Sequence, residues 1–367
     1  MMYENRVDKL RARFQELGVD TIWIVQPENR RYLSGFKAPD GQLTESSGSL
    51  LITLHEALLI TDSRYTTQAE QEVVGFEVVT QKRSLVDTLS EKVRSLGTKR
   101  LGFEGGYLVW ELFQQVNNKL SQQSPPIELA ALSAPVERLR EIKEQGELEL
   151  LRSSAVLMSD VLARVIAELK PGESEKEVAW KIETWIRDQG AEESSFPPIV
   201  ASGPNSALPH AVPTERSLRE GEPIILDVGA KLEGYCSDMT RTVFLGDPSE
   251  EVKKIYATVR EAQIAAMKAV RPGMKTTEAD SIARDHIARA GYGDYFGHSL
   301  GHGIGLAPHE TPALAPRKPK TLQEGMVFTI EPGIYIPGKG GVRLEEMVFL
   351  GSDGAELLTR NNNFYSF

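Results

Sequence analysis

The chain has 367 residues, 40% of them hydrophobic and 26% charged, and this length exceeds what one hydrophobic core usually supports, so we expect two domains. Its formal net charge of −10 argues against a nucleic-acid partner, because affinity for a phosphate backbone comes from Lys and Arg. The absence of a long apolar run or a secretory pattern at the start, together with a single cysteine, Cys236, indicates a cytoplasmic protein without a membrane span or an internal disulfide.

The first 135 residues alternate between helical and strand patterns. Arg6 to Leu17 is amphipathic and stops at Gly18, which predicts a helix, and TIWIV at 21–25 predicts a strand. Further strands are expected at 50–53 and 57–60, with helices after Ser63 and Ser84. The only histidine here, His55, lies in a turn-like sequence, and no glycine-rich phosphate loop is present. We expect an α/β domain over 1–135 without chemistry of its own.

The second domain, expected over 136–367, contains an internal duplication. After a charged helical stretch, a Pro-Gly turn leads into a helix twice, at a constant offset of 101 residues. The matched residues are Pro171, Gly172, Glu177 and Gly190 in the first copy and Pro272, Gly273, Glu278 and Gly291 in the second. A Pro-His pair follows in each copy, ending at His210 and His309. We expect an α+β domain with pseudo-two-fold symmetry.

Each copy then places acidic residues on a predicted hairpin. Residues 223–245 read as two strands, and a turn centred on Leu232 and Glu233 would make Asp227 and Asp238 direct cross-strand partners. In the second copy, Glu331 and Glu345 are centred on Gly338. Like charges on neighbouring strands of an apolar hairpin are costly, so these pairs require shared protons or a bound cation.

Two divalent cations would neutralise four carboxylates, and metals ~3.5–4 Å apart can clamp a hydrolytic transition state. Oxygen ligands favour manganese or magnesium, and an added imidazole extends the choice to cobalt, zinc or iron. The segment around His298 and His302 has glycine at 297, 301, 303 and 305, which argues against a helix. In an extended segment both histidines face one side, which suits one metal ligand and one neighbour. His286, in the repeat helix, is expected to be a surface residue.

Together the segments ILDVGA, YCSDMTRT, HSLGHGIG, TIEPGIY and GVRLEE resemble the Xaa-Pro peptidases of the pita-bread metallopeptidase family, which includes aminopeptidase P and prolidase. PENRRYLSGF and ITDSRYTTQA resemble the creatinase-like N-terminal domain of that family, so the resemblance covers nearly the whole chain. It implies a creatinase-like domain over 1–135, a pita-bread catalytic domain over 136–367, and two bound metal ions, with manganese first and cobalt, zinc or iron as alternatives.

The resemblance also implies a ligand set. Asp227 would bind one metal, His302 and Glu331 the other, and Asp238 and Glu345 would bridge the two. Metal polarisation lowers the pKa of a bound water, and Glu331 would help to move its proton.

Further residues match family positions around the substrate. Three histidines would hold the scissile carbonyl, the proline ring or developing charge: His210, His298 and His309. Arg343 matches an arginine that orients ligating carboxylates through charged hydrogen bonds. Tyr235 and Thr240, which flank Asp238, are candidates for the same supporting role.

The expected activity is removal of the N-terminal residue from short Xaa-Pro peptides, as an Xaa-Pro aminopeptidase, with an Xaa-Pro dipeptidase (prolidase) as the alternative. Methionine aminopeptidases share the ligands but generally lack the N-terminal domain. Creatinase works without metal, and a peptide-binding pseudo-enzyme would be expected to have lost ligands. The resemblance further implies a homodimer acting on short proline-containing peptides.

Overall fold

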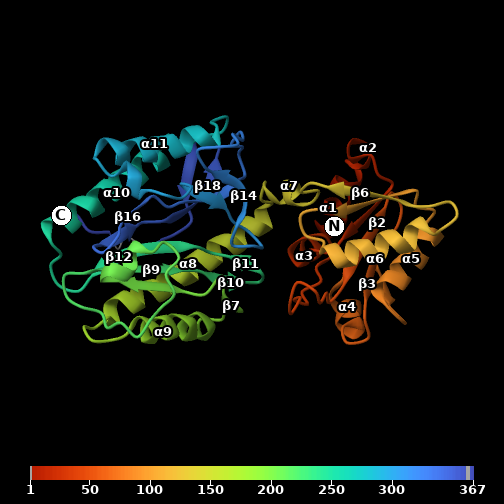
Figure 1. Cartoon of the computed structure of the whole chain (residues 1–367), viewed down its shortest axis with the longest axis horizontal. Helices are drawn as coiled ribbons and strands as arrows, with labels where there is room; N and C mark the ends of the chain where they lie inside the picture. Colours follow the sequence, from red (N-terminus) through yellow and green to blue (C-terminus); the bar gives the residue numbers. More distant parts are fainter. Residues whose placement is uncertain (1, 361–363) are drawn as a thin grey trace. The chain divides into compact units, whose positions relative to one another are not determined.

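The structure is a computed structural model that describes residues 2–360 and 364–367. The chain forms two compact units, an N-terminal unit, Met1–Arg140, and a C-terminal unit, Glu141–Phe367, each with its own hydrophobic core (Figure 1). None of the helices in the described ranges combines the length and the apolarity that a bilayer crossing requires.

The N-terminal unit is built on a six-stranded mixed sheet in the order β4-β3-β2-β1-β5-β6. Its strands are β1 (Thr21–Ile24), β2 (Ser49–Thr53), β3 (Ala57–Thr61), β4 (Glu77–Thr80), β5 (Arg100–Glu104) and β6 (Glu128–Leu132). Its helices are α1 (Met2–Arg11), α2 (Phe14–Leu17), α3 (Pro27–Ser34), α4 (Thr66–Glu72), α5 (Leu85–Ser95), α6 (Trp110–Ser121) and α7 (Glu137–Arg140). The central strand β1 is buried along its whole length, and α5 and α6 contribute apolar residues to the same core as the sheet.

One predicted helix of this unit is divided in two. The sequence predicted a single helix from Arg6 to Leu17, whereas the chain forms α1 and α2 with a turn between them. Within the turn, Arg13 donates from Nη1 to the carbonyl oxygen of Pro135 at 2.8 Å, a long-range contact that helical periodicity alone does not reveal. The predicted end is confirmed, because Gly18 caps α2 with a left-handed φ of 65°.

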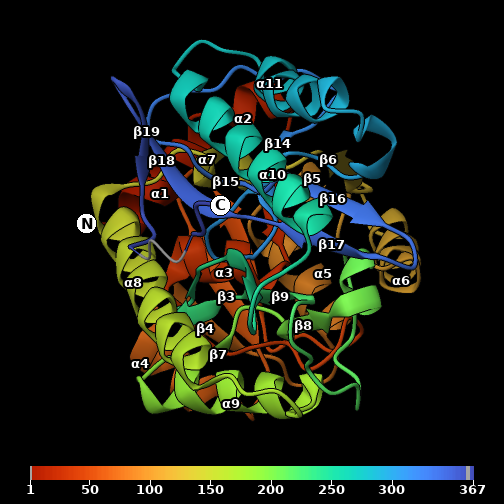
Figure 2. The same cartoon turned by 90° about the vertical axis from the view of Figure 1, so that its left-hand side faces the viewer.

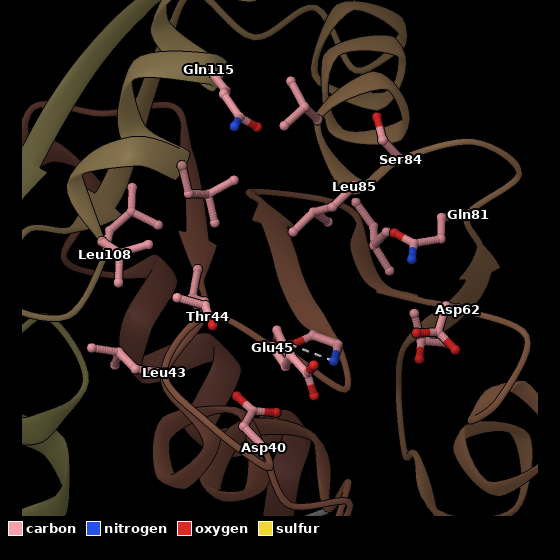
Figure 3. Close-up of a pocket in the computed structure, with 18 of the residues that line it drawn as sticks. Asp40, Leu43, Thr44, Glu45, Asp62, Gln81, Ser84, Leu85, Leu108 and Gln115 are labelled. Atoms are coloured by element: carbon pink, nitrogen blue, oxygen red, sulfur yellow. Dashed lines mark hydrogen bonds between the residues drawn. The ribbon is translucent and has the colours of Figure 1, made fainter.

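A cavity of about 490 Å³ lies within the N-terminal unit (Figure 3). The carboxylates of Asp40, Glu45 and Asp62 lie along one side of it, and Leu85 lies along the other. Arg30 pairs with Asp40 at 3.0 Å, and Arg64 pairs with Asp62 at 2.8 Å. Much of the negative charge on this wall is therefore already balanced within the unit.

The C-terminal unit packs four long helices around short antiparallel sheets. Its helices are α8 (Gln145–Glu168), α9 (Glu175–Asp188), α10 (Glu250–Ala269) and α11 (Thr276–Arg289), with short 3₁₀ turns η1 (Gly203–Ala207) and η2 (Gly293–Tyr295). Its first seven strands are β7 (Glu193–Ser194), β8 (Ile199–Ser202), β9 (Pro223–Val228), β10 (Ala230–Leu232), β11 (Tyr235–Cys236), β12 (Met239–Phe244) and β13 (Gly301–Gly303). The others are β14 (Glu310–Leu314), β15 (Val327–Ile330), β16 (Gly333–Ile336), β17 (Gly340–Arg343), β18 (Glu346–Gly351) and β19 (Gly354–Leu357). Figures 1 and 2 show α8 and α9 on one side of these strands and α10 and α11 on the other.

The predicted duplication is confirmed by matched geometry in the two halves. Gly172 and Gly273 have φ angles of 93° and 90°, and each precedes a helix that begins with a capping box. Their amides donate to the carbonyls of Leu218 and Leu322, each at 2.9 Å. Strands β8, β9 and β12 are neighbours in the first half, and β13, β15 and β18 are neighbours in the same order in the second.

The two hairpins differ in how well their register was predicted. Asp227 pairs with Thr240, so the predicted direct pairing of Asp227 with Asp238 is wrong by two residues. The turn is centred on Glu233 and Gly234, whose φ angles of 47° and 82° are those that a tight two-residue turn requires. Because a shift of two residues keeps the same face of a strand, Asp238 still lies on the side of Asp227.

In the second hairpin, the pairs Ile330–Glu346 and Gly333–Arg343 bracket Glu331 and Glu345, as the centring on Gly338 predicted.

Candidate metal centre

A cavity of about 510 Å³ in the C-terminal unit is lined by side chains from both halves of the duplication. It contains all nine residues that the sequence singled out for metal binding and catalysis: Asp227, Asp238, His302, Glu331, Glu345, His210, His298, His309 and Arg343. Its remaining lining is largely apolar. The chain thus brings together side chains that are up to 135 positions apart in the sequence, the separation of His210 and Glu345.

Strand ends position the acidic residues. Asp227 lies on β9, Asp238 immediately precedes β12, Glu331 follows β15, and Glu345 lies between β17 and β18. His302 lies on β13, where a Cβ on either flanking glycine would come within 2.2 Å of a neighbouring carbonyl oxygen. Only glycine therefore allows β13 to approach its neighbours closely enough to place the imidazole beside the carboxylates.

Burial and mutual repulsion shape the protonation of the acidic cluster. Burial, followed by the neighbouring Glu345 and Asp227, raises the pKa of Asp238 well above its usual value. Burial and then Glu345 raise the pKa of Glu331, and burial and then Asp227 raise the pKa of Glu345 to about 8. Each carboxylate thus makes ionisation of its neighbours harder, so the protein alone does not balance the charge of this cluster.

The donor atoms fit a cation. Asp227 Oδ1 and Asp238 Oδ1 are buried and have no hydrogen-bond partner among the described residues. His302 donates from Nδ1 to the carbonyl of Gly303 at 3.1 Å, which leaves Nε2 as a lone-pair donor. That Nε2 lies 3.3 Å from Glu331 Oε1 and 3.6 Å from Asp238 Oδ2. Three lone-pair groups this close repel one another unless a positive charge lies between them.

Ligand atoms of Asp238, His302 and Glu345 all lie within 4.8 Å of one another. Oxygen atoms with one imidazole nitrogen suit manganese, cobalt, zinc and iron among the divalent ions. The cluster is therefore a candidate metal centre on its chemistry as well as on its spacing.

Arg343 connects the cluster to the surrounding loops. Its Nη2 donates to Asp227 Oδ2 at 2.5 Å, and its Nη1 donates to the Tyr335 hydroxyl at 2.8 Å and to the Pro209 carbonyl at 3.1 Å. Its Nε donates to Thr240 Oγ1 at 3.2 Å, and that hydroxyl in turn donates to Glu345 at 2.7 Å. The guanidinium therefore fixes the orientation of Asp227 directly and that of Glu345 through the Thr240 hydroxyl.

His298 is held as a neutral ring of defined tautomer. Its Nδ1 donates to the carbonyl of Ser299 at 2.8 Å, so its Nε2 accepts from the Tyr335 hydroxyl at 2.8 Å. Burial, together with the nearby Arg343, lowers the pKa of His298 to about 4. Tyr335 thus links Arg343 to His298, because its hydroxyl accepts a hydrogen bond from Arg343 and donates one to His298.

The other two histidines lie at the open side of the cavity. The ring of His309 lies 4.2 Å from that of His302, and both His309 and His210 are exposed. Tyr235, a candidate for a supporting role, instead donates its hydroxyl to Glu147 of α8 at 2.9 Å and is not among the described residues that line the cavity. Thr240, the other such candidate, lies between Arg343 and Glu345.

Sequence reasoning missed Tyr335 and the apolar wall of the cavity. Tyr335 stands four residues after Glu331 in TIEPGIY, a segment from which the sequence analysis took only Glu331. The wall is made of apolar residues from the run that leads into β8 and from the loop around His210: Phe196, Pro197, Pro198, Ile199, Pro209, Ala211, Val212 and Pro213. The proline-rich run before β8 and the residues after His210 were the available signals.

A duplicated α+β unit whose two halves converge on such a centre, following an α/β unit, has the architecture of a two-domain metal-dependent hydrolase. Residues 149–352 match the model of metallopeptidase family M24, and residues 6–142 match the creatinase/prolidase N-terminal domain. The chain therefore belongs to metallopeptidase family M24, with a creatinase-type N-terminal domain, and is a metallo-exopeptidase. These matches confirm the predicted fold class, a creatinase-like domain followed by a pita-bread domain.

Several relatives extend over almost the whole chain. The Xaa-Pro dipeptidase of Pyrococcus furiosus is 37% identical over 97% of this chain and 98% of its own. The structure of an Xaa-Pro dipeptidase from Bacillus anthracis matches with a TM-score of 0.92 and 40% identity, covering 98% of both chains. That of an X-Pro aminopeptidase from Thermotoga maritima matches with a TM-score of 0.85 and 38% identity, covering 97% of this chain and 98% of the other.

Proposed function

We propose that the protein hydrolyses the Xaa-Pro bond at the N-terminus of short peptides, using two divalent metal ions held by Asp227, Asp238, His302, Glu331 and Glu345. The observation that carries the proposal is the convergence of four carboxylates with buried, unpartnered oxygens on Asp227 and Asp238. The names of the relatives, Xaa-Pro dipeptidase and X-Pro aminopeptidase, supply the substrate class.

Different residues of the cavity would have different roles in the reaction. Two cations at this centre would supply Lewis acidity and make a nucleophile from water at neutral pH. Glu331, steadied by a hydrogen bond from Thr329 Oγ1 at 3.2 Å, lies where it can accept and return a proton. His309 and His210, at the open side, are suited to hold the scissile carbonyl and the developing charge. Manganese is the metal we propose first, because oxygen donors outnumber nitrogen.

The apolar wall suits a proline residue. An Xaa-Pro bond is a tertiary amide without an N–H, so recognition must come from the shape of the pocket rather than from a hydrogen-bond acceptor. Phe196, Pro197 and Val212 offer such a surface beside the acidic cluster. We propose that the proline ring of the substrate packs against these residues.

One observation favours each of the two specificities. Several relatives are named Xaa-Pro dipeptidases, which favours cleavage of dipeptides. A dipeptide specialist needs a cation for the free carboxylate of proline, and Arg343, whose nitrogens are already engaged, is the only Lys or Arg among the described residues of the cavity. That arrangement favours a peptide that extends beyond proline, as in the Xaa-Pro aminopeptidase reaction.

The test compares hydrolysis of Ala-Pro with that of Ala-Pro-Ala after chelator-treated protein is supplied with manganese. Cleavage of the dipeptide alone assigns a prolidase, and cleavage of the tripeptide assigns an aminopeptidase. A peptide beginning Met-Ala-Ala serves as the control for a methionine aminopeptidase. Binding of these peptides without metal-dependent cleavage would reject the proposal in favour of a peptide-binding protein.

We also propose that the protein is a homodimer, as the resemblance to its family implies. The mass of one chain is 40.6 kDa. Light scattering at micromolar concentration should therefore give about twice that mass, and the mass of a single chain would contradict the proposal.

A further inference from the structure

The loop that carries His309 is held in place by the segment that opens the C-terminal unit. The His309 loop, residues 304–309, runs between β13 and β14. The anchor segment, Glu141–Lys143, forms an isolated bridge between Ile142 and Met326, the residue that precedes β15. The amide of Lys143 donates to the carbonyl of Gly325 at 2.9 Å. The backbone of the anchor segment is thus fixed to the sheet that contains β13 and β14.

A buried ion pair joins the anchor segment to the His309 loop. Lys143 Nζ lies 3.2 Å from Glu310 Oε2, and the two side chains are only 1% and 7% exposed. The other oxygen of Glu310 accepts the amide of Ala307 at 3.0 Å. A Cβ on Gly305 would come within 2.7 Å of the Glu310 carboxylate, so this carboxylate also packs against the loop backbone. The Glu310 carboxylate therefore holds the backbone of the His309 loop, and Lys143 holds that carboxylate in place.

A second set of contacts joins the anchor segment to the residues that follow the His309 loop. Thr311 Oγ1 donates to Glu141 Oε1 at 2.7 Å, and Lys320 also pairs with that carboxylate. The contacts of Lys143 and Glu141 are thus made with the two residues that directly follow His309, Glu310 and Thr311. The far side of the loop is held by the amide of Cys236, which donates to the carbonyl of Gly305 at 2.8 Å. His309 is exposed, so its position depends on how its backbone is held.

We propose that Lys143 and Glu141 are positioning residues that set the place of His309 against the substrate. The proposal rests on the proposed function, because it takes His309 to contact the substrate. A shift of ~1 Å in a group that contacts the reacting atoms can lower a rate by about 100-fold. A buried ion pair is weak evidence of stabilisation, since its desolvation offsets much of its attraction, but it can specify one geometry.

The first test reads the loop without any assay of activity. Hydrogen exchange of the peptide that covers 304–311 should become about tenfold faster in K143M, because the Glu310 carboxylate loses its ion pair with Lys143. T311V, which removes only a hydroxyl partner, should raise the same exchange to a smaller extent. K181M is the matched control, because Lys181 pairs with Glu173 away from the cavity. Unchanged exchange in both K143M and T311V would overturn the proposal.

The second test asks whether Lys143 acts through His309. We expect K143M to lower kcat about tenfold with KM within twofold and with an unchanged metal content. The double variant K143M/E310Q should recover most of this loss, because it removes the buried charge that Lys143 balances. In an H309A background, K143M should cause no further loss, whereas a general structural role would give the same tenfold loss again. An additive loss, or a loss of metal, would overturn the proposal.

The two proposals fail separately. If the wild-type protein cleaves neither Ala-Pro nor Ala-Pro-Ala, the proposed function fails, and the exchange measurement still decides whether the anchor segment holds the loop. If the wild-type protein cleaves a substrate but K143M retains full kcat, only the positioning role is rejected.

Discussion

Arg343 donates from Nη2 to Asp227 Oδ2 at 2.5 Å, and both side chains are buried beside the candidate metal centre. Because the guanidinium offsets one of the four carboxylate charges, two divalent ions would leave the centre with a net positive charge. Such a centre favours an anionic nucleophile and the oxyanion of a tetrahedral transition state. The pair therefore contributes to the charge of the site as well as to its geometry.

The first prediction concerns this pair. R343K should weaken metal affinity by about 10- to 100-fold and lower kcat/KM, because an ammonium cannot reproduce the four hydrogen bonds that the planar guanidinium donates. Isothermal titration with Mn²⁺ measures the affinity. R216K is the matched control, because Arg216 makes a bidentate pair with Glu222 outside the cavity. Equal metal affinity in R343K and the wild type would show that Arg343 does not orient a ligand.

The second prediction tests the proposed bridging carboxylates. D238A or E345A should abolish binding of both metal ions and hydrolysis, because each removes a ligand shared between the ions. Metal content by elemental analysis and turnover of the better peptide give the result. The N-terminal unit should stay folded, since neither residue belongs to it. Full activity in either variant would contradict the site assignment.

The third prediction concerns pH and metal removal. Burial and mutual repulsion raise the pKa of Asp238, Glu331 and Glu345, the last from 4.5 to about 8. The folded metal-free protein therefore binds more protons than the unfolded chain between about pH 4.5 and 8, so its stability falls as pH rises through that window. Thermal unfolding should show this fall without metal and a much smaller fall with saturating Mn²⁺. Parallel curves would indicate that the cations do not neutralise these groups.

The fourth prediction separates His309 from the metal ligands. H309A should lower kcat about 100-fold while both ions stay bound, because it removes a group that acts on developing charge. The check is turnover together with metal content on the same sample. Loss of metal in H309A would place His309 among the ligands instead.

The fifth prediction concerns Glu104, which is buried in the N-terminal unit. Burial raises the pKa of Glu104 from 4.5 to about 7, although Asn29 and the amides of Val25 and Gln26 donate to it. Stability of this unit should therefore fall by up to about 3 kcal/mol as pH rises between those values. E104Q should flatten the dependence, measured by hydrogen exchange of β1 amides, whereas E128Q, at an exposed position, should keep it.

Much of the candidate site could be predicted because its residues interrupt strong local patterns. Asp227 stands out within an apolar strand, and glycines around His302 exclude a helix. The register of the first hairpin could not be predicted, because a turn at Glu233 and Gly234 fits the apolar pattern as well as one shifted by a residue. Tyr335 was missed because its contacts with His298 and Arg343 depend on the folded chain, and no local pattern marks them.

The link between Lys143 and Glu310 spans 167 positions, and no local pattern in the sequence reveals a contact of that kind. The same holds for the contact from Arg13 to Pro135, which lies at the turn that divides the first predicted helix. Local patterns and the resemblance to a family thus predicted which side chains gather at the candidate centre, whereas the anchor segment became visible only in the folded chain.

Because of the duplication, the side chains of the candidate centre come from two halves of the C-terminal unit that must lie close together. The first half supplies Asp227 and Asp238, and the second supplies His302, Glu331 and Glu345. Neither half alone contains all five proposed ligands, so the candidate centre requires both halves. Joining the halves in one chain replaces a concentration-dependent encounter with a permanent one, because covalent linkage sets a high effective concentration of each half near the other. The proposed ligands therefore stay together at any dilution of the protein.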